Sequence, residues 1–144
     1  MGQRIFEIFP SKNTAVLVLE RGGRFFGDGV YFGLGGTFYT INPKKDALPE
    51  IKQDIVVIVD SVINTAKSIS KIINVIKTQN PKVEIIIATN VIQEKAVELL
   101  KNYPVFTVRV SSNYFVGNNQ AKQKGKKGPD TADRLFNLIE QRFI

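Results

Sequence analysis

The feature that most constrains this 144-residue chain is a run of five β-branched residues, 55–59, that ends at Asp60. A strand that is apolar at every position is covered on both faces, which is typical of a parallel sheet. Residues 83–88 (VEIIIA) predict a second buried strand, and between the two strands isoleucines recur at helical spacing, namely Ile69, Ile72, Ile73 and Ile76. This order of strand, helix and strand predicts a right-handed crossover unit.

The same alternation continues on both sides of this unit. It predicts helices at 66–79 and 91–101, a strand at 105–110, and further strands at 14–20 and 37–41. The segment 25–36 is rich in Gly and aromatic residues and leaves its state open, with a short helix as one possibility. Residues 130–143 have helical spacing. We therefore expect an α/β fold, a Rossmann-like parallel sheet with flanking helices, in one domain over residues 1–144.

The composition excludes several kinds of chemistry. The chain has no Cys and no His, so thiolate catalysis, Cys or His metal sites and Ser-His-Asp triads are ruled out. No apolar segment is long enough to span a bilayer, and no signal-peptide core is visible at the N-terminus. These features lead us to expect a cytoplasmic protein without a membrane partner.

The formal net charge of +7 is concentrated in one stretch. Residues 118–128 hold four lysines and no acid: Lys122, Lys124, Lys126 and Lys127. Such a loop is either a solvated segment that keeps the protein soluble or a surface that attracts anions, nucleic acid included. The sequence contains no recognisable nucleic-acid-binding motif, so both interpretations stay open.

Polar residues gather where the first buried strand passes into its helix. The segment 60–68 reads DSVINTAKS and contains Thr65, Lys67 and Ser68. Amide groups in the first turn of a helix are natural phosphate ligands, and the hydroxyls and the ammonium would add to them. The alternative is that Asn64 or Thr65 only caps the helix. Neither a Walker motif nor a dinucleotide fingerprint is present.

This segment resembles the phosphoribosyl-diphosphate loop of type I phosphoribosyltransferases, in which an apolar strand, an acid and a Thr-x-x-Ser turn follow one another. Other segments are similar to the uracil phosphoribosyltransferase branch, in the same order along the chain. They are the diphosphate loop around Arg21–Gly22, the lead-in at 38–60, the Tyr-containing stretch 113–117 and the segment 128–136.

The resemblance implies transfer of a phosphoribosyl group to uracil, giving UMP and diphosphate in pyrimidine salvage. It implies catalytic roles for Asp60, Arg21 and Asp130. It further implies that phosphoribosyl diphosphate is bound by Arg21, Gly22, Asp60, Thr65, Ala66, Lys67, Ser68 and Ile69. Uracil would be bound by Tyr114, Phe115, Val116, Gly128 and Asp130. Mg²⁺ would arrive on the diphosphate rather than on a protein metal site, and a homodimer is implied.

The chain also departs from the family pattern. Ser61 stands where the wider class has a second acid, and Ala66 and Lys67 replace glycines, so a Cβ at Ala66 could obstruct the phosphate. The flexible flap that covers the diphosphate in the family is also expected to be missing. Two alternatives therefore remain beside the enzyme. One is a catalytically degenerate relative that binds a nucleotide or RNA, and the other is an unrelated α/β protein whose motifs are turn and cap chemistry.

Overall fold

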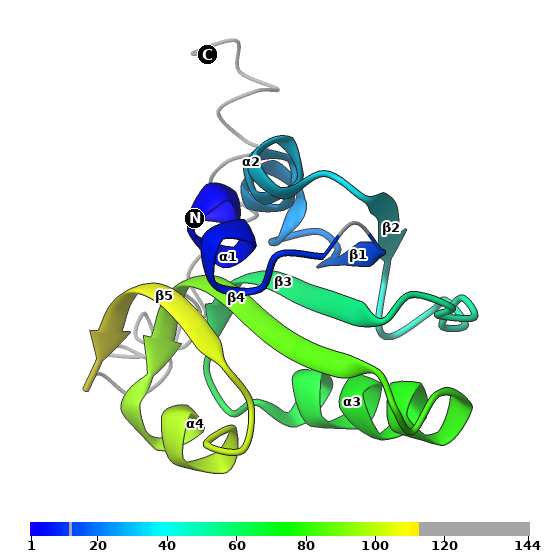
Figure 1. The fold of residues 1–144 in the computed structure, drawn as a ribbon. Coiled ribbons are helices and arrows are strands. Elements are labelled where there is room, and N and C mark those ends of the chain that lie inside the picture. The colour runs from blue at the N-terminus through cyan, green and yellow to red at the C-terminus, as the bar shows by residue number, and fades with distance from the viewer. Residues whose placement is uncertain (12, 113–144) are drawn as a thin grey trace, which may run out of the picture.

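The computed structural model describes residues 1–11 and 13–112, which form one parallel sheet with helices on both faces (Figure 1). The sheet has five strands in the order β2-β1-β3-β4-β5. They are β1 (Thr14–Leu19), β2 (Thr37–Ile41), β3 (Ile55–Ile63), β4 (Glu84–Gln93) and β5 (Val105–Ser111). The helices are α1 (Gly2–Ile8), α2 (Arg24–Leu34), α3 (Lys67–Gln79) and α4 (Glu94–Leu99). The expected Rossmann-like fold class is confirmed.

The core lies in two layers, one on each face of the sheet. Helices α1 and α2 cover one face and α3 and α4 cover the other (Figure 1). Alternate residues of β3 supply the two layers: Val56 and Ile58 face the α3 side, and Val57 and Val59 face the α2 side. Residues 55–59 are all buried, which is why every position of this strand is apolar.

Helix α2 lies very close to the sheet because of one glycine. A Cβ added at Gly27 would stand 2.3 Å from a methyl carbon of Val18 on β1. No side chain fits in that space, so Gly27 sets the distance between helix and strand. The segment 25–36, whose state the sequence leaves undecided, is helical as far as Leu34. Its packing against β1 explains why a segment rich in glycine forms a helix here.

Two strands run further than the apolar pattern predicted. Strand β3 continues to Ile63 and β4 to Gln93, because Val62 pairs with Val91 and Ile63 with Ile92 in parallel register. The predicted helix at 91–101 therefore begins only at Glu94. In α4, Ala96 is buried, whereas Leu99 is 67% exposed. Helix α1 was not anticipated.

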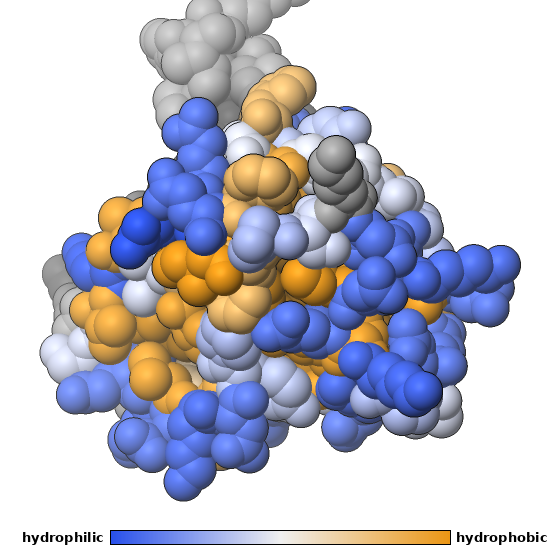
Figure 2. All heavy atoms as spheres, in the orientation of Figure 1, coloured by the Kyte–Doolittle hydropathy of each residue, from blue (hydrophilic) through white to orange (hydrophobic). Residues whose placement is uncertain are grey.

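Apolar side chains remain at the surface in two places. Phe25 and Phe32 of α2 are exposed, whereas Phe26 and Tyr31 pack partly against the core. Figure 2 shows apolar atoms gathered over the sheet edge formed by β5, where Val108 and Val110 are exposed. No helix of the described residues is long and apolar enough to cross a membrane.

Candidate functional site

The predicted diphosphate and phosphate loops meet at the carboxyl ends of β1 and β3. The buried hydroxyl of Ser61 donates a hydrogen bond to the carbonyl oxygen of Gly22. A Cβ built on Gly22 would lie 3.7 Å from Oδ1 of Asp60, so that carboxyl stands directly beside the loop. The sequence placed these segments at one rim of the sheet, and the structure brings them into contact.

Gly23 explains how the first loop comes so close to β3. A side chain there would begin 2.6 Å from the carbonyl oxygen of Leu19 and 2.9 Å from that of Val59. Such separations are far below normal contact, so only glycine fits this position. The Glu20–Arg21 peptide bond in the same loop is cis.

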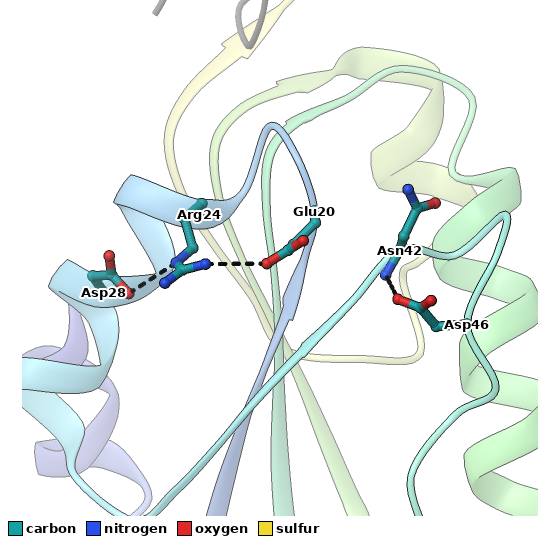
Figure 3. A network of polar contacts seen from close by, with 5 residues as sticks. All are labelled: Glu20, Arg24, Asp28, Asn42 and Asp46. Atoms are coloured by element: carbon teal, nitrogen blue, oxygen red, sulfur yellow. Dashed lines mark hydrogen bonds and ion pairs between the residues drawn. The ribbon is translucent and has the colours of Figure 1, made fainter. Parts of the chain in front are cut away.

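The arginines of this loop differ in their surroundings. Arg24 lies between two acids, with Nη1 3.2 Å from Oε1 of Glu20 and Nε 3.8 Å from Oδ1 of Asp28 (Figure 3). These two ion pairs hold the positive charge of Arg24 at the start of α2. Arg21 is exposed at the turn next to Gly22, where the resemblance expects the diphosphate. The role of Arg21 toward the diphosphate stays a prediction.

Asp60 lies between the two loops. Burial raises the pKa of its carboxyl to about 7, against the opposing effect of the backbone N–H groups of Val62 and Ser61. The carboxyl is therefore divided between its neutral and ionised forms near neutral pH. A group of this kind can accept hydrogen bonds from ribose hydroxyls when ionised, and it can also exchange a proton.

The predicted phosphate loop enters α3 through a residue with a positive φ. Ala66 has φ 55° and precedes α3, and no side-chain hydrogen bond caps this helix among the described residues. Ala66 rather than Asn64 or Thr65 holds the cap position, so the capping alternative is wrong. Thr65, Lys67 and Ser68 are all exposed around this start. Hydroxyls, an ammonium and first-turn amides thus gather at one place, which suits an anion.

The methyl group of Ala66 does not stand over the loop. Ala66 is only 4% exposed and belongs to the core layer under α3. A left-handed conformation at a non-glycine residue costs roughly 1–2 kcal/mol, and burial of the methyl returns about 0.8 kcal/mol. The geometry therefore does not support the expectation that the Cβ of Ala66 obstructs the phosphate.

The connection between β2 and β3, where the family has its flap, is short and folded on itself. The N–H of Asn42 donates to Oδ2 of Asp46 at 2.6 Å (Figure 3), and the N–H of Lys44 donates to Oδ1 of Asn42 at 3.0 Å. Residues 42–54 join the strands with this turn at their start. The absence of the flap stays an expectation from the sequence, which rests on the short connection at Gly36–Thr37.

Several predicted site residues lie outside the described part of the chain. These are the uracil-binding candidates Tyr114, Phe115, Val116, Gly128 and Asp130, and the lysines Lys122, Lys124, Lys126 and Lys127. Their roles stay predictions. In the sequence, Ser61 is visible only as the replacement of an acid, because no pattern in the chain reveals a partner 39 residues away.

The described residues contain no group of three acidic side chains that could hold a metal ion. Asp60 is the carboxyl beside Gly22, and a single carboxylate is a weak Mg²⁺ site unless substrate oxygens and water complete the shell. This donor set fits a magnesium ion that belongs to the diphosphate substrate.

Several solved structures share the fold of this chain. TT1426 from Thermus thermophilus has a TM-score of 0.61 at 17% identity, over 78% of this chain and 81% of its own. The orotate phosphoribosyltransferase from Aeropyrum pernix gives 0.58 at 21%, over 74% and 65%. The purine phosphoribosyltransferase from Pyrococcus horikoshii gives 0.57 at 21%, over 78% of each. The chain therefore has the type I phosphoribosyltransferase fold.

The family follows from the sequence profile described as uracil phosphoribosyltransferase, which matches residues 40–138. Because the match spans more than half of the chain, the protein belongs to this family. The matched range contains the phosphate loop and the predicted uracil segments, whereas Arg21 and Gly22 precede it. The curated proteins include no match to this chain.

Proposed function

We propose that this chain transfers the phosphoribosyl group of phosphoribosyl diphosphate to uracil, giving UMP and diphosphate, as a single domain. One observation carries the proposal: the Arg21–Gly22 loop and the Asp60–Ser61 strand end are joined at the rim where α3 begins. Membership of the family supports the reaction class, and the choice of uracil rests on that family alone.

In this proposal the first turn of α3 holds the 5′-phosphate. The hydroxyls of Thr65 and Ser68, the ammonium of Lys67 and the backbone at Ala66 and Ile69 are its ligands. Asp60 accepts hydrogen bonds from the ribose hydroxyls. Arg21 and the backbone of Gly22 face the magnesium-bound diphosphate. Tyr114, Phe115, Val116, Gly128 and Asp130 bind uracil.

The chemistry asks little acid–base work of the protein. The bond from ribose C1 to the diphosphate oxygen breaks as uracil N1 attacks C1, and the N1 proton is released. Positive charge around the diphosphate stabilises the leaving group, while binding aligns the two reactants. A chain without histidine can supply both contributions.

The test combines binding and turnover. Isothermal titration with phosphoribosyl diphosphate and Mg²⁺ should show one site, and labelled uracil should then be converted to UMP. Thr65→Asp should abolish binding, because it sets a carboxylate against the phosphate, and should leave the fold intact at a helix start. Asn74→Asp, on the exposed side of α3, makes the same charge change away from the rim and should bind normally. Absence of binding by the unaltered chain would sink the proposal.

A second candidate is a catalytically degenerate member that binds a nucleotide or RNA through the same rim. The compact connection at 42–54 favours it, because a site without a flap exposes the reaction to water. It predicts binding of phosphoribosyl diphosphate without any turnover of uracil. The two steps of the titration and turnover test therefore separate the candidates.

A further inference from the structure

Strands β3 and β4 change faces together shortly before they end. In a regular strand, residues four apart lie on the same face of the sheet. Val59 belongs to the core layer that faces α1 and α2, whereas Ile63 belongs to the layer that faces α3 and α4. Ala88 and Ile92 of β4 are divided between the two layers in the same way. Because the two strands stay in register throughout, their side chains are turned at the same level of the sheet.

A row of polar residues crosses the sheet at this level. Asp60 on β3 pairs with Thr89 on β4, and Thr89 pairs with Thr107 on β5. Each of the three side chains bonds to its own strand. The carboxyl of Asp60 accepts the backbone N–H groups of residues 61 and 62, and each threonine hydroxyl donates to the carbonyl oxygen two residues further on, at 3.2 Å and 3.0 Å. Local bonds of this kind explain why polar side chains interrupt apolar strands here.

Asn90, which follows Thr89 on β4, has no such bond. The residue is half-buried, and its backbone carbonyl accepts the hydroxyl of Thr107 at 3.4 Å. Within residues 1–11 and 13–112, however, its carboxamide has no hydrogen-bond partner. Asn is disfavoured in strands, and a carboxamide that bonds to nothing adds no stability there. Its two donors and its acceptor are therefore available to a ligand at the carboxyl ends of the strands.

The order of the strands indicates which part of a substrate reaches Asn90. This step rests on the proposed function, in which the diphosphate lies at the Arg21–Gly22 loop after β1 and the ribose lies at Asp60 on β3. The attacking nitrogen of the base must approach ribose C1 from the side opposite the leaving diphosphate, so that bond formation and bond breaking are aligned. Strand β4 adjoins β3 on the side away from β1 (Figure 1). The base therefore lies toward β4, one strand beyond the ribose.

We infer that Asn90 donates a hydrogen bond from its carboxamide NH₂ group to the carbonyl oxygen beside the attacking nitrogen of the base, which is O2 in uracil. Asn90 follows the register partner of Asp60, so it stands close to the level of ribose C1. The N1–H bond breaks as the N1–C1 bond forms, and while the proton leaves to solvent, part of the charge on N1 is shared with O2. A donor placed at O2 stabilises this charge. Asn90 thereby selects bases that carry a carbonyl beside the attacking nitrogen, and it moves no proton itself.

The test compares ribose 5-phosphate with UMP by titration calorimetry on the full chain. The first probe lacks the base, and the second carries it. Asn90→Ala should weaken UMP binding by about fivefold or more, in line with one lost hydrogen bond, and should leave the affinity for ribose 5-phosphate unchanged. Asn90→Leu keeps the volume of the side chain and should give the same result. Asn102→Ala removes an exposed carboxamide from the turn before β5 and should change neither affinity.

Thio analogues of UMP identify the atom that is recognised. The 2-thio analogue replaces O2 by sulfur, which is a weak acceptor, and the 4-thio analogue makes the same change at O4. The unaltered chain should bind the 2-thio analogue about threefold or more weakly than UMP, whereas Asn90→Ala should bind the two alike. The ratio for the 4-thio analogue should be the same in both proteins. An unchanged ratio for the 2-thio analogue in Asn90→Ala would overturn the contact to O2.

The outcomes separate this inference from the proposed function. If ribose 5-phosphate binds and both Asn90 variants bind UMP as the unaltered chain does, the inference is rejected and the phosphoribosyl site stands. An equal loss of both probes in the variants would assign Asn90 to the folding of the rim and would also reject the inference. If neither probe binds to the unaltered chain, the inference and the proposed function are both rejected. None of these readouts needs turnover, so they apply equally to a catalytically degenerate member.

Discussion

Asp60 and Ser61 are adjacent in the sequence and serve the same rim in different ways. Ser61 is buried and binds the carbonyl of Gly22, which holds the first loop against the end of β3. Asp60 lies next to that loop with a carboxyl whose pKa burial raises to about 7. One residue therefore fixes the geometry of the rim, and the other gives it a charge that depends on pH.

The pKa of Asp60 predicts a pH effect on stability. Its folded value, about 7, lies above the ordinary pKa of 3.8 for this carboxyl. The favourable contribution of the protonated carboxyl is therefore complete below pH 4 and is lost as pH rises through 7. Relative to the unaltered chain, Asp60→Asn should gain on the order of 2–3 kcal/mol in free energy of unfolding between pH 5 and pH 8. Urea unfolding of both proteins at each pH measures this difference, and parallel curves would contradict the raised pKa.

Ser61→Ala should affect both stability and ligand binding. Removal of the hydroxyl leaves the carbonyl of Gly22 without this donor, at a cost of about 1–3 kcal/mol in free energy of unfolding. Affinity for magnesium diphosphate, measured by calorimetry, should also fall, because the loop loses its attachment to β3. Ser70→Ala on α3 is the control. It should lower neither the free energy of unfolding nor the affinity for magnesium diphosphate. Unchanged diphosphate affinity in Ser61→Ala would confine the bond to a role in folding.

At the scale of elements, the sequence predicted the strands and helices of the crossover units well and their ends less well. Residues 55–59 indicate a buried strand, but Ser61 and Val62 continue it only because β4 lies alongside. The same pairing takes residues 91–93 from the predicted helix and shortens α4. Local pattern decides what kind of element forms, whereas a neighbouring strand decides where it ends.

Two glycines of α2 offer a test of packing between elements. Gly27→Ala should lower the free energy of unfolding by about 1–3 kcal/mol, since its Cβ would overlap Val18. Gly29→Ala, with nothing within 4 Å of its Cβ, should instead stabilise the helix by about 0.5–1 kcal/mol. Denaturant unfolding of both variants gives the comparison. Val18→Ala combined with Gly27→Ala should recover part of the loss, and a purely additive double variant would argue against direct packing of the two residues.

For the molecule as a whole, the net charge of +7 is the property with the broadest consequence. Four of these charges belong to Lys122, Lys124, Lys126 and Lys127, so replacing all four with Gln lowers the formal charge from +7 to +3. Their role stays a prediction, because the described residues reach only to 112. The homodimer also stays a prediction.

The quadruple glutamine variant separates the two functional candidates. If the lysines bind RNA, retention on single-stranded RNA should weaken. The slope of log affinity against log salt should then become shallower by about 0.7 for each phosphate that the variant no longer neutralises. If the lysines replace the missing flap, the KM for phosphoribosyl diphosphate should rise and RNA retention should not change. Filter binding and steady-state kinetics on the same preparation provide the readouts. An unaltered result in both assays would assign these lysines to solubility.

The sequence alone determined the class of fold, because fully apolar β-branched runs alternating with helical isoleucine spacing suit only a covered parallel sheet. It also determined which residue types reach the rim: an acid, hydroxyls, an arginine and glycines. Tertiary structure alone decided the bond from Ser61 to Gly22, the raised pKa of Asp60 and the burial of Ala66. Each of these depends on distances between segments far apart in the chain, and such distances follow from how helices and sheet pack rather than from local pattern.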